Sequence, residues 1–207
     1  MITNEEILMS YPDQLIQISE SSARVEAFDG VFDGTDLWLL RLPFNPQSAG
    51  VTAGLIVQVT EANSANPRSG LYIVSIVNSD SVRLRQAGYE TAVGRGPGVT
   101  FGTSTVKCAI YDLSSFIRSA QKAVDSVACP KYTAMDTRLA AQADDAVKRL
   151  ALVRLCSNSE QLRLLIGTSG VSLLELEEEI LGSLKSALLQ FMSRNLGSAV
   201  KWTKLVR

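Results

Sequence analysis

The stretch LYIVSIVNSDSVRLRQ, residues 71–86, decides the fold class of the middle of the chain. Two runs rich in β-branched residues flank the turn-forming corner Asn78-Ser79-Asp80, which is the pattern of a β-hairpin. In the second run, residues 82–85, valine and leucine alternate with two arginines, so we expect one buried and one solvated face. The hairpin therefore predicts an antiparallel sheet.

Further strands are expected on both sides of this hairpin, because β-branched segments alternate with turn formers from about residue 31 to residue 110. The expected strands are Asp36–Leu42, Val51–Thr60, Gly70–Asn78, Asp80–Gln86 and Val99–Ile110. No helical segment separates them, which argues against parallel βαβ units. Five short strands at this spacing predict a small antiparallel barrel or sandwich.

Helical patterns dominate the two ends of the chain. Thr3 followed by Glu6 is a capping box for a first helix, and a second short helix is expected over residues 12–22. After the strands, apolar residues recur at helical spacing in three segments, which predicts three amphipathic helices. They are expected at about 112–128, 135–156 and 172–196, the last starting with a capping box of Ser172 and Glu175.

From this order we predict an α+β protein in which both chain ends form one helical bundle, interrupted by a small antiparallel β-barrel or sandwich domain. The bundle is assigned to residues 1–29 and 111–197, the inserted β-domain to 30–110, and a C-terminal docking tail to 198–207. The acidic start differs from a secretory signal, and no apolar run is long enough to span a bilayer. The three unpaired-looking cysteines suit a reducing compartment, so we expect cytosolic synthesis and buried thiols.

The 207 residues include no histidine, and the cysteines, Cys108, Cys129 and Cys156, are widely spaced. Histidine is the usual proton shuttle near neutral pH and the commonest metal ligand. Ser-His-Asp and Cys-His machinery and histidine-based zinc sites are therefore excluded. We expect no catalytic residue, no metal and no cofactor, and hence a function in contact. The net charge of −1 favours neither nucleic acid nor an anionic membrane as a partner.

Two motifs suggest chemistry, and each has a simpler interpretation. The glycine-rich run 94–98 lacks the spacing and following helix of a phosphate-binding loop, so we interpret it as a barrel loop in which Arg95 contacts a partner. Glu175 and the glutamates of 177–179 lie within one turn, where carboxylates could act as acid and base. At a helix N-terminus the dipole already favours negative charge, so a solvated first turn explains them.

The last segment of the sequence combines basic charge with aromatic and apolar side chains. No acidic residue follows Glu179. Residues 198–207 carry Lys201, Trp202, Lys204, Leu205 and Arg207. Three destinations for this tail are open: its own domain, a neighbouring subunit, or nucleic acid. Aromatic and basic side chains are frequent interface anchors, so we favour the neighbouring subunit.

Three segments resemble a family of head–tail connector (adaptor) proteins of tailed bacteriophages. The opening TNEEILMSYPDQLIQIS (3–19) is similar to the family's first helix, turn and second helix. DLSSFIRSAQKAVDSVACPKY (112–132) and RLAAQADDAVKRLALVRLCSN (138–158) are similar to its next two helices. The resemblance implies a mostly helical protein in which residues 28–110 are a β insertion, whose role it does not explain.

The resemblance also implies a structural virion protein, made in the host cytoplasm and located in the neck of the particle. Such proteins assemble, usually as twelve copies, into a ring between portal and tail proteins, with DNA passing through the bore and no membrane partner. Exchange of tails and loops between adjacent subunits is then expected. A tail-completion or baseplate component, a ligand- or glycan-binding β-domain on a helical oligomerisation module, and a hydrolase that uses carboxylates stay open as alternatives.

Overall fold

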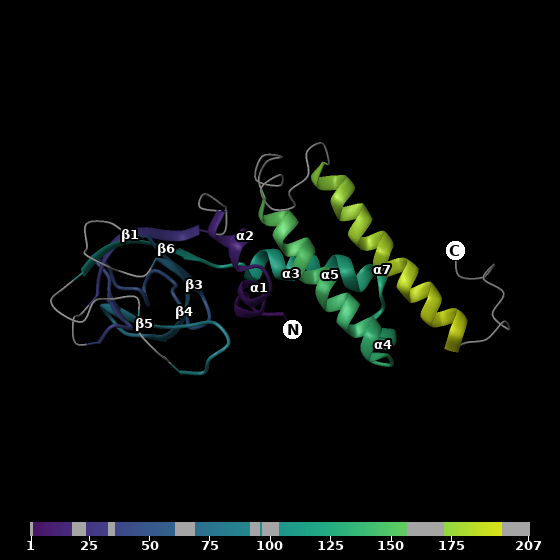
Figure 1. Ribbon diagram of the computed structural model, residues 1–207, viewed down its shortest axis with the longest axis horizontal. Coiled ribbons are helices and arrows are strands. Elements are labelled where there is room, and N and C mark those ends of the chain that lie inside the picture. Colours follow the sequence, from purple (N-terminus) through teal and green to yellow (C-terminus); the bar gives the residue numbers. More distant parts are fainter. Residues whose placement is uncertain are drawn as a thin grey trace. The chain divides into compact units, whose positions relative to one another are not determined.

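The computed structural model describes residues 2–17, 24–32, 36–60, 69–91, 96, 104–156 and 172–195. The chain divides into two compact units, each of which is visible in Figure 1. The first unit comprises residues 1–115 and 155–167, and the second comprises residues 116–154 and 168–207. The first unit contains the strands and the two N-terminal helices, and the second is formed by the helices that follow.

Six strands of the first unit form a closed antiparallel barrel. They are β1 (Arg24–Phe32), β2 (Leu39–Arg41), β3 (Ile56–Thr60), β4 (Gly70–Val77), β5 (Ser81–Arg85) and β6 (Ser104–Tyr111). The order around the barrel is β1-β2-β5-β4-β3-β6, and β6 pairs with β1 to close it. The expected hairpin is confirmed as β4 and β5, in which Val74 lies opposite Leu84. Closure leaves no open edge among the described strands.

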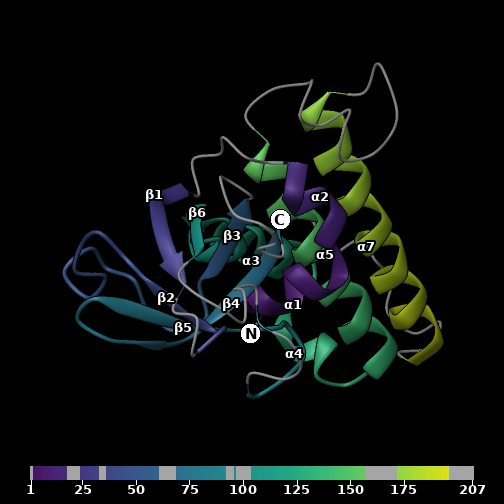
Figure 2. The ribbon, with the colours of Figure 1, turned by 60° about the vertical axis from the view of Figure 1, so that its left-hand side comes forward.

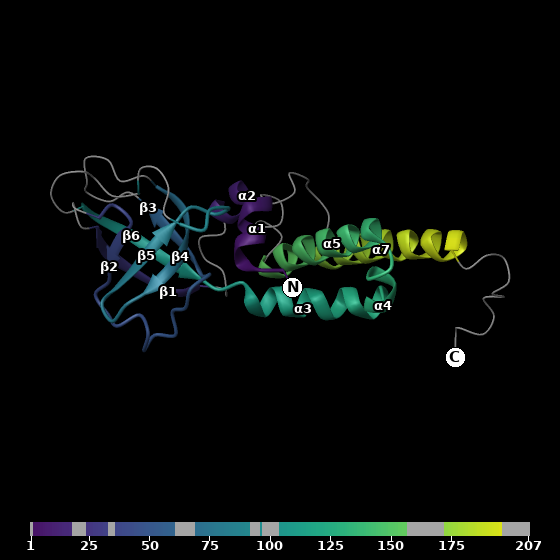
Figure 3. The ribbon, with the colours of Figure 1, turned by 90° about the horizontal axis from the view of Figure 1, so that it is seen from below.

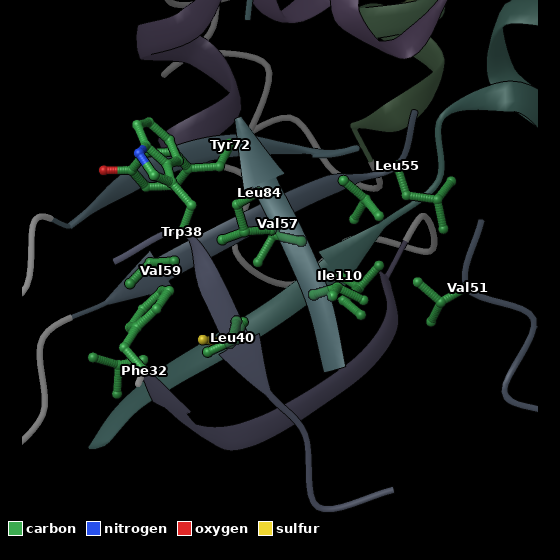
Figure 4. Close-up of a cluster of buried hydrophobic side chains, with 14 residues drawn as sticks. Phe32, Trp38, Leu40, Val51, Leu55, Val57, Val59, Tyr72, Leu84 and Ile110 are labelled. Atoms are coloured by element: carbon green, nitrogen blue, oxygen red, sulfur yellow. The ribbon is translucent and has the colours of Figure 1, made fainter. Parts of the chain in front are cut away.

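Alternate residues of the strands fill the barrel interior, and Figure 4 shows these side chains pointing into the space that the strands enclose. The largest fully buried members of this cluster are Phe32, Leu40, Leu84, Ile110, Val57, Val59 and Val74. Trp38 and Tyr72 pack edge to face, with ring centroids 6.2 Å apart. The interior is therefore a packed core, stabilised by the removal of apolar surface from water.

Two short N-terminal helices belong to the first unit: α1 (Asn4–Ser10) and α2 (Pro12–Gln17). α1 packs against β3, and α2 packs against β4. The middle of each of these strands is apolar on both faces. Val57 and Val74 belong to the interior cluster, whereas their neighbours Ile56 and Ile73 alternate to the outer face. These isoleucines are fully buried, as is Ile7 of α1, so the short helices cover an outer apolar patch of the barrel.

This arrangement overturns the predicted fold class. The two chain ends do not form one helical bundle around an inserted domain, because the N-terminal helices bury their apolar side chains on the barrel. The bundle is confined to the C-terminal half of the chain. The sequence pattern also fails to predict β1, which crosses the expected boundary between residues 29 and 30 and supplies the closing strand.

The second unit is formed mainly by α3 (Ser114–Val127), α4 (Pro130–Thr133), α5 (Thr137–Leu155) and α7 (Leu173–Asn195). α5 and α7 lie side by side in Figures 2 and 3. They are antiparallel, because Arg154 near the end of α5 pairs with Glu177 near the start of α7. α3 and α7 each bury one apolar stripe, such as Leu176, Ile180 and Leu184 on α7. The three expected helices are confirmed, but the single stripe expected for α5 is wrong at its end, where residues 150–153 are all buried.

Two glycine-to-alanine changes test the packing. A Cβ atom on Gly30 of β1 would lie 2.6 Å from Leu40 Cδ1 and 3.1 Å from Phe28 Cε2. Gly30→Ala should therefore lower the free energy of unfolding by about 1–3 kcal/mol through overpacking. A Cβ atom on Gly182 of α7 would meet nothing within 4 Å. Gly182→Ala should therefore raise the free energy of unfolding by about 1 kcal/mol, because alanine favours the helix more than glycine does. Urea unfolding followed by circular dichroism measures both, and a shift of the same sign for the two variants contradicts this assignment.

Candidate functional site

Polar side chains do not gather into a metal site in the described part of the chain. Those residues contain no group of three or more histidine, cysteine, aspartate or glutamate side chains that could hold a metal ion. None of the described helices combines the length and the apolar character that crossing a membrane requires.

Asn4 connects the first helix to two segments that flank strands of the barrel. Its Nδ2 donates to the carbonyl oxygen of Gly54 at 3.2 Å and to Asp112 Oδ1 at 3.4 Å. Its Oδ1 accepts the backbone N–H of Leu113 at 3.1 Å. The Asn4 side chain is buried, and these bonds satisfy its amide. Asn4 therefore fixes the start of α1 relative to the segments before β3 and after β6.

The neighbouring residue, Glu5, forms a two-pronged ion pair with Arg85 of β5. Arg85 Nη2 lies 2.6 Å from Glu5 Oε2, and Nη1 bonds to Oε1. Glu5 Oε1 also accepts the N–H of Gly88 at 2.8 Å, and Arg85 Nη1 donates to the carbonyl of Tyr89 at 2.7 Å. The hydrogen bond from Arg85 lowers the pKa of Glu5, and the Gly88 bond adds to this against the opposing effect of burial. The cluster holds the loop after β5 against α1.

The described surface of the helical unit includes two large grooves. The first has a volume of about 420 Å³ between α5 and α7, and its charged lining residues are Arg138, Asp145 and Arg149. The second has a volume of about 380 Å³ and is mostly apolar. It is lined by Val127, Cys129, Tyr132, Leu188, Leu189 and Met192, together with Asp125, Ser126 and Lys185. The second groove thus combines an apolar surface with one charge of each sign.

The acidic turn at the start of α7 is largely structural. Glu175 accepts the N–H of Ser172 at 2.8 Å, and this bond lowers its pKa. The expected capping box is confirmed, because Ser172 Oγ accepts the N–H of Glu175 at 3.2 Å. Glu177 Oε1 accepts a hydrogen bond from Arg154 Nε of α5 at 2.7 Å. Arg154 Nη1 also donates to Ser119 Oγ of α3 at 2.7 Å. Glu175 therefore caps α7 itself, and Glu177 joins α7 to α5.

The residues expected to form a partner interface lie outside the described residues: Arg95, Lys201, Trp202, Lys204, Leu205 and Arg207. Of the glycine-rich run 94–98, only Gly96 is described, and it is buried. Sequence reasoning missed the apolar groove and the roles of Asn4 and Arg85. The available signal for the groove was Leu189, which falls beside the apolar stripe of α7 and is 44% exposed.

Comparison of the chain with known protein families, with curated proteins and with solved structures finds no match. What the protein does must therefore be inferred from its own residues. The described geometry offers surfaces for binding, namely the two grooves and the exposed ends of α7.

The Glu5–Arg85 pair predicts a pH-dependent contribution to stability. We expect Glu5→Gln to lower the free energy of unfolding by about 1 kcal/mol at neutral pH, a small value because water screens this partly exposed pair. The pKa of Glu5 is lower in the folded than in the unfolded chain. Its contribution is therefore present above the unfolded-state pKa and is lost as the pH falls through the lowered folded-state value.

Urea unfolding of wild type and Glu5→Gln at neutral and at acidic pH measures this difference, which should vanish in acid. Glu26→Gln is the matched control, because Glu26 is an exposed carboxylate on β1 of the same unit. It should change stability little at either pH. A Glu5→Gln chain as stable as wild type at neutral pH would show that the pair contributes nothing.

Proposed function

We propose that this chain is a structural connector of a tailed bacteriophage, located in the virion neck, where identical subunits form a ring between portal and tail. The observation that carries the proposal is the asymmetry of α7, whose two ends present different charges beside exposed leucines. The segments that resemble head–tail connector proteins, 112–132 and 138–158, contribute α3, α4 and most of α5 to the same helical unit.

The start of α7 is acidic, and the rest of the helix is basic. Its four glutamates all lie within residues 175–179, and only the basic residues Lys185 and Arg194 carry charge further along it. Leu174 at the start is 66% exposed, and Leu189 near the end is 44% exposed. The helix has 23 residues, which corresponds to about 34 Å. The two ends are therefore too far apart to meet within one copy.

Two different and complementary surfaces on one subunit favour head-to-tail association. Such heterologous contacts generate a ring when the rotation between neighbours closes, whereas a two-fold contact between identical patches stops at two copies. Opposite charges would set the register, and the exposed Leu174 would supply apolar area at the acidic end. The alternative of a ligand-binding barrel gains no support from the barrel interior, because side chains fill it.

Charge reversal at the two ends of α7 tests the head-to-tail contact. We expect Glu178→Lys or Arg194→Glu alone to weaken self-association by roughly fivefold per interface, the effect of about 1 kcal/mol for an exposed ion pair. The double variant should restore association, because the exchanged charges attract again. Light scattering and sedimentation, with and without the portal protein of the same phage, measure the assembly.

Salt and a control variant complete this experiment. High salt should reduce the difference between wild type and the single variants, because it screens exposed charges. Glu26→Lys on the barrel reverses an exposed charge outside α7 and should leave association unchanged. A double variant that associates as poorly as the single variants contradicts contact between these two ends.

The place of the protein in the virion is tested in a phage that encodes it. We expect the chain in purified particles at a constant copy number, with antibody label at the neck. Loss of the chain should give DNA-filled heads that carry no tails, because the ring joins the two. Absence from purified particles, or label confined to the baseplate, would exclude the connector role.

A further inference from the structure

The apolar groove of the helical unit has no occupant among the described residues. One wall is α7, which contributes Leu188, Leu189 and Met192. The other wall is the end of α3 and the start of α4, which contribute Val127, Cys129 and Tyr132. A groove of this character, beside a leucine that is 44% exposed, is a surface that an apolar side chain can cover.

We propose that this groove binds residues 196–207 of the same chain, with Trp202 as the anchor. α7 ends at Asn195, one turn beyond the groove residue Met192. The farthest groove residue on α7 is Lys185, about 15 Å back along the helix. Residues 196–201, when extended, span about 20 Å. Trp202 can therefore reach the groove of its own chain.

The sequence of residues 196–207 suits both a change of chain direction after α7 and binding in the groove. Gly197 is the residue type that most readily adopts the left-handed backbone with which a chain turns back after a helix. Trp202 and Leu205 supply apolar side chains for the groove walls. Of the two charges in the groove lining, Asp125 attracts Lys201 and Lys204, whereas Lys185 repels them. The segment therefore offers groups that complement the groove.

Proximity favours the segment's own chain over a neighbour. A short flexible connection keeps a tethered group at millimolar effective concentration near a site within its reach, which free copies in dilute solution do not match. Of the three destinations left open by the sequence, the position of the groove beside the helix end thus selects the tail's own domain. This inference goes beyond the proposed ring and does not depend on it.

Cys129 provides a built-in reporter of the groove. Cys108 and Cys156 are buried, and burial raises the pKa of the first to about 12 and of the second to about 11. Both thiols therefore react slowly at neutral pH. The expectation of buried thiols is wrong for Cys129, which is exposed and lines the groove. The rate at which a thiol reagent modifies the full chain then reports how well the groove is covered. The Cys129→Ser variant shows which part of the modification comes from Cys129, because that part is lost.

We expect Trp202→Ala to speed the modification of Cys129 by up to roughly 30-fold, the factor that corresponds to about 2 kcal/mol for a buried tryptophan anchor. Leu189→Gln should have a similar effect, because it changes the groove wall. Leu174→Gln is the matched control, since it alters an exposed leucine at the other end of α7. It should leave the rate unchanged. An added peptide of residues 196–207 should restore protection to the Trp202→Ala chain.

The outcomes that overturn the proposal are distinct. Equal rates in wild type and Trp202→Ala, with no protection by the peptide, would show that the tail does not bind the groove. Protection that disappears on dilution of the wild-type chain would assign the tail to a neighbouring copy. These rates require neither ring nor portal, so a failure of the connector role leaves them unaffected.

Discussion

The outward-facing isoleucines of β3 and β4 are the constraint on which the first unit depends. Ile56 and Ile73 lie directly opposite each other, and a bare outer barrel face would expose both to water. α1 and α2 pack on these two strands, and Asn4 and Glu5 then fix where α1 begins. The loop after β5 and the segment after β6 both depend on the position of α1, because the N–H groups of Gly88 and Leu113 donate to Glu5 and Asn4 of this helix.

The sequence predicted local structure well and the assembly of elements poorly. The hairpin and the long helices were predictable because periodicity and capping boxes are local signals. An amphipathic pattern shows that α1 has a buried face, but not which element covers it. The sequence signal that was overlooked is the pairing of adjacent apolar residues, Ile56 with Val57 and Ile73 with Val74. These pairs make β3 and β4 apolar on both faces, which is typical of strands that are covered on both sides. β1 was not predicted, because its first half is exposed and therefore lacks the alternation of buried and exposed residues that marks a strand.

The candidate interaction surfaces show the same division between local and distant signals. The role of Glu175 in a cap followed from its spacing to Ser172. The link from Arg154 to Glu177 and Ser119 did not, because these partners are 23 and 35 positions away in the sequence. The apolar groove likewise joins residues of α3 and α7 that no periodicity relates. Composition suggested that this protein works by contact, but only the packing of helices shows which surfaces are available.

Barrel closure also sets an order of events during synthesis. The side chain of Asn4 bonds to the backbone of Leu113, 109 positions later, and the residues of β1 pair with residues of β6 that lie 72 to 87 positions later. Loop-closure entropy opposes contacts of this separation until both partners are present. The first helix and strand therefore leave the ribosome long before their partners exist, whereas only the short connection that contains α4 separates α3 from α5. The part of the chain made first completes its structure late.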